Sequence, residues 1–142
     1  MSEPLIFDTS VWIDFLRGKR NPQSDLLTSY VEQEDQVLLT PTILQEVLQG
    51  IREDTQYRQI KDIFSYFTVL QLPPVQAAIG AAELYRGLRK KGVTIRKSND
   101  CMIAFYAIEL STSLVHLDGD FELISKHSKL KTWSLAERKG NL

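Results

Sequence analysis

Five acidic residues stand where the chain is expected to change from one element to the next: Asp8, Glu46, Asp100, Asp118 and Asp120. Each follows or ends an apolar segment, where a solvated surface acid is not expected. Carboxylates that are brought together repel one another and lose hydration, so such a cluster normally requires a cation. Oxygen-only ligands suit Mg²⁺ or Mn²⁺, and those ions typically act on phosphates. The pattern predicts a metal-dependent enzyme that acts on phosphodiesters.

Each acid also has an ordinary structural interpretation. Asp8 fits a turn at a helix entry, and Asp118 and Asp120 flank a glycine in another good turn. Glu46 lies beside an apolar helical stripe and could be a solvated acid. Asp100 could complement a helix dipole, with Ser98 or Asn99 as N-cap. However, Asp100 shares a face with the apolar residues three, four and seven positions later. The joint pattern therefore favours function.

Short apolar runs alternate with amphipathic stretches along the chain. This alternation predicts an α/β fold with a mainly parallel sheet, whose ligand sites lie beyond the C-terminal ends of the strands. Asp8 and Asp118 are each expected at such an end. Strands are expected at 4–8, 37–40, 68–72, 114–117 and 130–133, and helices at about 11–16, 22–34, 41–51, 56–66, 74–91, 99–110 and 121–126.

Composition sets broad limits on what the chain can be. Its 142 residues, 43% of them hydrophobic, predict one domain over residues 1–142. No apolar run approaches the roughly 20 residues that span a bilayer, and no secretory signal opens the chain. The single cysteine, Cys101, fits a reducing compartment, so a cytoplasmic location is expected. A net charge of −1 disfavours binding nucleic acid by bulk charge alone.

Four stretches of this chain resemble the PIN domain in order and spacing, and are most similar to VapC-type toxins of type II toxin–antitoxin modules. These stretches are FDTSVWIDFLRG, LQEVLQG, IRKSNDCMIAFYAI and LVHLDGDFELIS. The resemblance covers nearly the whole chain and implies a three-layer α/β/α fold. It also implies a Mg²⁺- or Mn²⁺-dependent ribonuclease that cuts single-stranded RNA, dimerises, and is silenced by an antitoxin inserted into its active-site groove.

The resemblance also ranks the site residues. Asp8, Glu46, Asp100 and Asp118 match the family's metal-binding acids, and Asp120 matches a frequent fifth acid. In the same comparison, Ser10 matches a small polar residue close to the metal. The chain departs from the family in two places: His116-Leu117 stand where many relatives carry Thr-His, and Phe105 replaces a commonly small residue.

A hypothesis for the chemistry follows from these matches. Metal ions held by the acids would offset the phosphate charge and activate water for in-line attack, leaving a 5′-phosphate and a 3′-hydroxyl. Asp8 and Asp100 are expected to contact metal directly. Glu46 and Asp118 are expected to do so directly or through water and to help take a proton. Asp120 is expected farther from the metal, outside its direct contacts.

Substrate attraction must come from local basic runs. Arg96 and Lys97 adjoin Asp100 in sequence and are the preferred candidates for phosphate contact; other runs occupy 17–20 and 86–91. The runner-up enzyme is a phosphatase or phosphotransferase with an aspartate nucleophile at Asp8. The remaining alternative is a binding module whose acids only cap helices.

Overall fold

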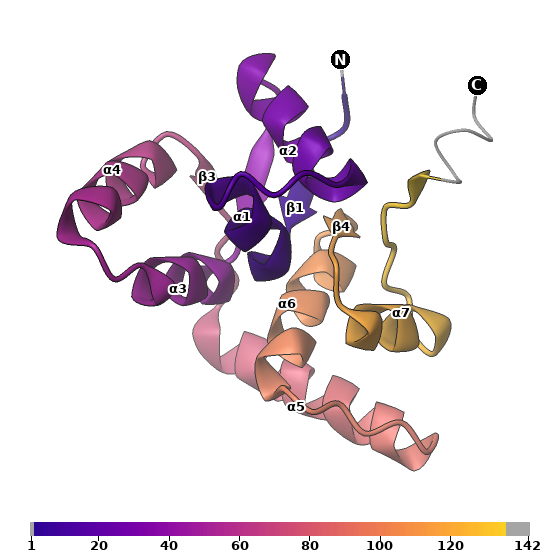
Figure 1. Cartoon of the computed structure of the whole chain (residues 1–142). Helices are drawn as coiled ribbons and strands as arrows, with labels where there is room; N and C mark the ends of the chain where they lie inside the picture. The colour runs from indigo at the N-terminus through magenta and orange to yellow at the C-terminus, as the bar shows by residue number, and fades with distance from the viewer. Residues whose placement is uncertain (1, 136–142) are drawn as a thin grey trace.

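A four-stranded, all-parallel sheet lies at the centre of the molecule (Figure 1), in the strand order β3-β2-β1-β4. The computed structural model describes residues 2–135. Because β1 lies between β2 and β4, its C-terminal end is flanked by two other strand ends. The strands are β1 (Leu5–Phe7), β2 (Val37–Leu39), β3 (Thr68–Val69) and β4 (Ser113–Val115).

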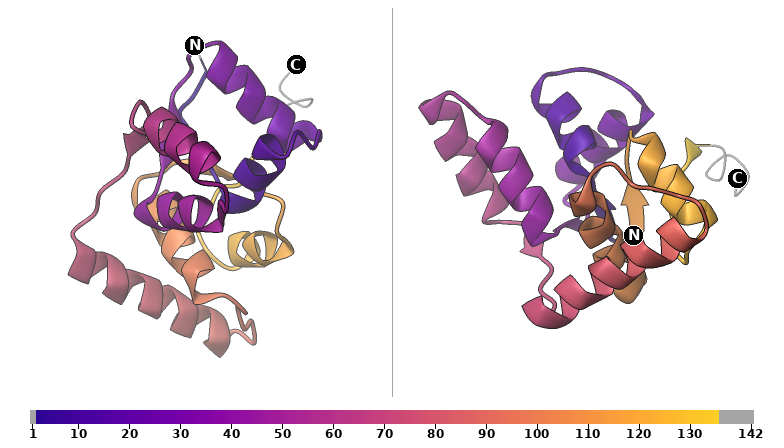
Figure 2. Two further views of the ribbon diagram at one scale, coloured as in Figure 1. Left: turned by 60° about the vertical axis from the view of Figure 1, so that its left-hand side comes forward. Right: turned by 90° about the horizontal axis from the view of Figure 1, so that it is seen from below.

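Seven helices connect and flank these strands within the described residues (Figures 1 and 2). Parallel neighbours require crossovers, and the helices supply them. No helix among residues 2–135 has the length and apolar character needed to cross a membrane. The helices are α1 (Thr9–Leu16), α2 (Pro22–Glu32), α3 (Pro41–Gly50), α4 (Asp54–Phe64), α5 (Pro74–Lys90), α6 (Ser98–Glu109) and α7 (Gly119–Lys126).

The core consists of the two central strands and the helix faces that cover them. Every residue of β1 and β2 is buried. Strands covered on both faces read as continuous apolar runs rather than alternating ones, which is why the sequence signals them clearly. Trp12 of α1 and Phe121 of α7 are among the largest fully buried side chains, and Cys101 is buried in α6. The predicted α/β fold with a parallel sheet is confirmed.

One predicted strand is wrong. Residues 130–133 form an isolated parallel bridge, Leu114 with Thr132, and not a strand. The N–H of Leu114 donates to Lys131 O, and that of Trp133 donates to Leu114 O, both at 2.9 Å. Leu130 is buried in the core and Trp133 packs against it, so apolar contacts hold the segment in place while its backbone forms only this one bridge.

The start of α6 also differs from the expectation. Neither Ser98 nor Asn99 is its N-cap; Lys97 is, and no side chain caps the helix. Both residues lie within the helix, which therefore presents uncapped N–H groups beside Asp100. An acid in the first turn of such a helix interacts favourably with these groups.

Helices α5 and α6 approach closely where small residues lie in α5 (Figure 2). Ala77 and Ala81 are buried in this contact. Gly80 lies under the ring of Phe105, and a Cβ atom at position 80 would overlap that ring. The large side chain at 105 is thus accommodated by the missing side chain at 80.

Candidate active site

Asp8 directly follows β1 and is the N-cap of α1. Its Oδ2 accepts hydrogen bonds from Ser10 N–H at 3.1 Å and from the Ser10 hydroxyl at 2.7 Å. The same Ser10 oxygen accepts from Leu117 N–H at 3.2 Å, and Asp8 N–H donates to Val115 O at 2.9 Å. Ser10 thus joins the ends of β1 and β4 at the carboxylate of Asp8.

Glu46 approaches Asp8 from α3. It is half-buried, and its Oε1 accepts a hydrogen bond from the Thr9 hydroxyl at 2.9 Å. Burial raises the pKa of the Asp8 carboxyl, hydrogen bonds from Ser10 oppose this shift, and the negative charge of Glu46 adds to it. Glu46 is therefore an oriented acid within electrostatic reach of Asp8, and not a solvated helix residue.

Three further acids form a compact group. Oxygens of Asp100, Asp118 and Asp120 lie within 4.8 Å of one another. Asp100 lies in the first turn of α6, and Asp118 is the N-cap of α7, its Oδ1 accepting from Asp120 N–H at 2.9 Å. Asp100 is only 6% exposed and Asp120 8%. Asp120, which the sequence reasoning ranked as the outermost acid, thus lies next to Asp100 and Asp118.

The group leaves acceptor oxygens without donors. Within residues 2–135, Oδ2 of Asp100 and Oδ2 of Asp120 are buried and make no hydrogen bond. A buried acceptor without a donor is costly, and an unpaired buried charge is more so. Carboxylate oxygens at this spacing are suitable ligands for a hard divalent cation. The cluster is thus consistent with the metal site of a PIN domain.

Charge repulsion links the acids from different elements. The pKa of Asp100 is raised to about 7, first by burial and then by the charges of Asp8 and Asp118, with a smaller effect of Asp120. The positive charge of Lys97 opposes the shift. Because Asp100 senses acids that follow both β1 and β4, the prediction that carboxylates would meet at one edge of the sheet is correct.

Arg96 is the cation nearest to Asp120. Its Nε lies 3.5 Å from Asp120 Oδ2, as an ionic neighbour rather than a hydrogen-bond donor. Its side chain is 78% exposed, so most of the guanidinium group faces solvent. Arg96 and Lys97 thus lie beside the acids, as expected from their place in the sequence. Their contact with substrate phosphate remains a prediction.

His116 supports the loop that carries Asp118. Its Nδ1 accepts from Asp118 N–H at 3.1 Å, and its Nε2 lies 2.8 Å from Glu122 Oε1. With Nδ1 as acceptor, the neutral ring carries its hydrogen on Nε2 and donates it to Glu122. His116 is 8% exposed and packs against Phe121. The pair His116-Leu117 departs from the family pattern, but His116 still provides hydrogen-bonded support for Asp118.

Three supporting residues were not found from the sequence: Thr9, His116 as a support, and Glu122. Thr9 meets Glu46 across 37 positions of the chain, a separation that no local pattern reports. His116 and Glu122 are six apart and separated by a turn. The only available signal was their closeness in sequence to Asp8 and Asp118.

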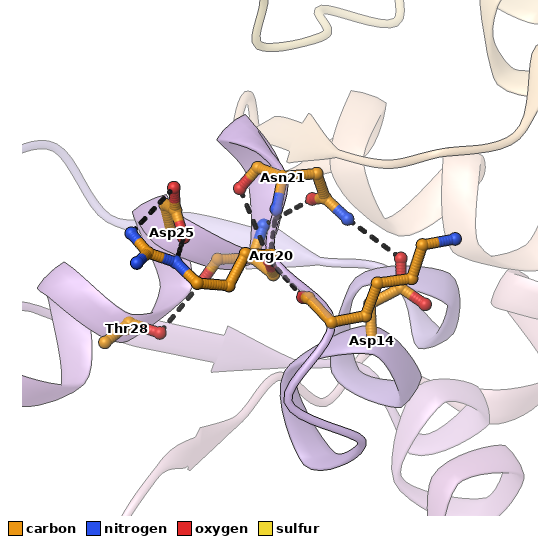
Figure 3. A network of polar contacts seen from close by, with 7 residues as sticks. Asp14, Arg20, Asn21, Asp25 and Thr28 are labelled. Atoms are coloured by element: carbon orange, nitrogen blue, oxygen red, sulfur yellow. Dashed lines mark hydrogen bonds and ion pairs between the residues drawn. The ribbon is translucent and has the colours of Figure 1, made fainter.

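Basic residues elsewhere are engaged in structural contacts. Figure 3 shows Arg20 directed at Asp25, with Nε 3.1 Å from Oδ1, while the Asn21 amide donates to Asp14. Lys91 donates to His127 O at 2.9 Å. Arg96 and Lys97 directly precede α6 and Asp100, while Arg17 and Arg52 line a pocket together with Glu46.

Comparisons with known proteins agree with this geometry. The PIN domain family model matches residues 5–127. VapC ribonuclease Mb1587 of Mycobacterium bovis and ribonuclease VapC11 of Mycobacterium tuberculosis are each 27% identical over 131 residues, 92% of this chain and 98% of the relative.

Solved structures share the fold. The VapBC2 structure from Rickettsia felis, bound to a promoter DNA fragment, matches with a TM-score of 0.71 at 20% identity, over 93% of this chain and 100% of the other. VapBC-1 from nontypeable Haemophilus influenzae gives 0.71 at 19% identity, over 93% and 98%. The resemblance to VapC-type proteins is confirmed. This chain belongs to the PIN domain family.

Proposed function

We propose that this protein is a metal-dependent endoribonuclease, the toxin of a type II toxin–antitoxin pair. The observation that carries the proposal is the group of Asp100, Asp118 and Asp120, whose carboxylates bring oxygens within 4.8 Å of one another, together with the buried Oδ2 atoms of Asp100 and Asp120 that lack a hydrogen-bond donor. Its relatives' names and the toxin–antitoxin complexes among its structural neighbours support the biological role.

In this proposal Asp100, Asp118 and Asp120 hold Mg²⁺ or Mn²⁺ together with Asp8. A bound divalent cation supplies charge that offsets the phosphodiester and makes water a better nucleophile. Glu46 is held by Thr9 through Oε1, which leaves Oε2 to accept a proton from the attacking water. Ser10 holds Asp8 in place, and Arg96 and Lys97 attract the phosphate backbone.

The partners follow from the same proposal. An antitoxin protein is the expected partner, supported by the toxin–antitoxin complexes among the structural neighbours, and we propose that it covers the site. A second copy of the chain is the other expected partner, as the resemblance to VapC-type toxins implies. We place the activity in the cytoplasm, where RNA substrates occur.

The test is cleavage of single-stranded RNA by wild type and by Asp8→Asn, with Mg²⁺, with Mn²⁺ and with a chelator. The amide keeps an oxygen for the helix cap but removes the charge. Wild type should cleave only with metal, and the variant should lose the activity while keeping its fold by circular dichroism. Full activity in Asp8→Asn would sink the proposal.

Two further measurements separate the alternatives. Phosphatase activity that depends on Asp8 in a protein without RNA cleavage would favour the aspartate-nucleophile enzyme. Absence of any stability gain from Mg²⁺ or Mn²⁺ would favour the binding module. Sequencing of RNA fragments after induced expression of wild type and Asp8→Asn would then identify the substrate.

A further inference from the structure

A groove of about 550 Å³ runs between α5 and α6, beside the acidic cluster. Its volume falls within the range of small-molecule sites. Helix α5 supplies small side chains along one wall, and α6 and the segment before it supply the other. The apolar lining consists of Ala78, Ala81, Ala82, Ile95 and Met102.

The polar rim of the groove carries two arginines that are ten positions apart in the chain. Arg86 comes from α5 and Arg96 from the segment that enters α6. Both are exposed, and within residues 2–135 no carboxylate lines the groove. Tyr85 is half-buried and also lines the groove, and the guanidinium carbon of Arg89 lies 5.6 Å from the centroid of the Tyr85 ring. The groove thus combines an apolar surface with two positive charges.

The groove is continuous with the candidate active site. Arg96 lines the groove and also lies 3.5 Å from Asp120 Oδ2. Ser98 and Asn99, which line it too, directly precede Asp100 in α6. Through Arg96 the groove adjoins the acidic cluster, which would let one nucleic-acid strand reach both.

We propose that this groove binds the nucleotide next to the scissile phosphate, with the base against the apolar lining and a phosphate between Arg86 and Arg96. This inference rests on the proposed ribonuclease function. An unpaired base offers an apolar face whatever its identity, and base stacking on aromatic side chains is sequence-tolerant. An inorganic anion would leave the apolar lining uncovered, and an apolar peptide would leave the arginines unpaired.

A matched pair of charge variants tests the phosphate contact. Arg86→Ala removes a charge from the groove, and Lys90→Ala removes one from the exposed end of the same helix, outside the groove. Binding of a short single-stranded RNA is measured in the Asp8→Asn background at several salt concentrations. Arg86→Ala should weaken binding and lower the salt slope by about 0.7, the value for one phosphate contact on a single strand. Lys90→Ala should leave both unchanged.

Two filling variants test the base contact without changing charge. Ala78→Trp and Ala82→Trp each place a large ring over the lining, and both alanines are exposed, so the core is not disturbed. Each should raise KM for RNA cleavage about tenfold, as expected for loss of one base contact, with kcat and Mg²⁺ affinity unchanged. Light scattering checks that both variants keep the assembly state of wild type.

An abasic nucleotide placed beside the cleavage site completes the test. Wild type should lose about tenfold in binding on this RNA, whereas Ala82→Trp should bind it as it binds the intact strand. Equal loss in both proteins, or wild-type KM in all groove variants, overturns the nucleotide site while leaving the ribonuclease proposal intact. If wild type cleaves no RNA with either metal, the proposed function itself fails.

Discussion

Gly80 of α5 lies directly under the ring of Phe105 of α6, and a Cβ atom there would overlap the ring. Gly80→Ala would normally gain up to about 1 kcal/mol of helix propensity. At this site the ring must move instead, so we expect a net loss of about 1 kcal/mol, typical of mild overpacking. Urea unfolding measures the difference.

The same helix offers a control for this substitution. Gly87 has open space where its Cβ would be, so Gly87→Ala should stabilise by up to about 1 kcal/mol. In a Phe105→Ala background, Gly80→Ala should also become stabilising, because the ring is gone. Destabilisation by Gly80→Ala in that background would contradict the contact.

Asp100→Asn should stabilise the metal-free protein at high pH. The Asp100 pKa is raised from 3.8 to about 7, so the folded state holds a proton that the unfolded chain releases. Stability therefore falls as pH rises from about 4 to about 7 and then levels off. Asp100→Asn removes this loss. We therefore expect its free energy of unfolding to exceed that of wild type by about 1–2 kcal/mol at pH 8 and to differ little at pH 4.

Thermal unfolding with a chelator, at pH 4, 6 and 8, measures this effect. Asp62→Asn, an exposed change in α4, is the control and should leave the pH profile unchanged. Adding Mg²⁺ at pH 8 should stabilise wild type more than Asp100→Asn. If the stability difference between Asp100→Asn and wild type did not grow between pH 4 and 8 without metal, the assignment would be disproved.

Ser10→Ala should reduce activity with little loss of fold. The Ser10 hydroxyl donates to Asp8 Oδ2 at 2.7 Å and accepts from Leu117 N–H at 3.2 Å. Without the hydroxyl, the Asp8 carboxylate and the loop after β4 lose this connection. Mutating a residue that is hydrogen-bonded to a metal ligand typically lowers metal affinity or activity about 10–100-fold. Ser10→Thr retains a hydroxyl and should retain most of the activity. Kinetics and Mg²⁺ titration distinguish the two variants.

His116 should act by positioning Asp118. In His116→Asn the amide oxygen can replace Nδ1 as acceptor for Asp118 N–H, whereas His116→Ala removes the acceptor. We expect His116→Ala to lower the Mg²⁺ affinity about 10–100-fold and His116→Asn to retain part of that affinity. Calorimetric Mg²⁺ titration measures both. Equal affinities in the two variants would show that only ring packing matters.

The Glu122 contact provides a separate comparison. Glu122→Gln keeps an oxygen for the His116 Nε2–H and should behave like wild type, whereas Glu122→Ala should resemble the weaker histidine variant. Wild-type Mg²⁺ affinity in Glu122→Ala would remove this residue from the support of Asp118.

Much of the fold could be predicted from the sequence because its central strands are short and continuously apolar. Asp8 and Asp118 could be placed at strand ends for the same reason. Residues 130–133 were misassigned because an apolar run alone does not reveal how many backbone partners the sheet offers. A single bridge to Leu114 is all that forms there.

Contacts between side chains were harder to predict. The Thr9–Glu46 hydrogen bond and the Arg96–Asp120 ion pair join segments 37 and 24 positions apart, so they depend on how helices pack. The family resemblance ranked Asp120 only as a frequent fifth acid, and its place in a turn says nothing about which way α7 directs it. Only the assembled fold brings its oxygen within 4.8 Å of Asp100 and Asp118.

Asp8 and Asp118 each cap the start of a helix and are also proposed metal ligands. Capping and ligation were competing interpretations in the sequence, but in the proposed metal site one carboxylate would serve both. The backbone that defines each helix start also fixes the direction of its acid before any ion arrives. Little conformational entropy then remains to be lost on metal binding. The protein is, in this respect, a preorganised receptor whose rigidity originates in its secondary structure.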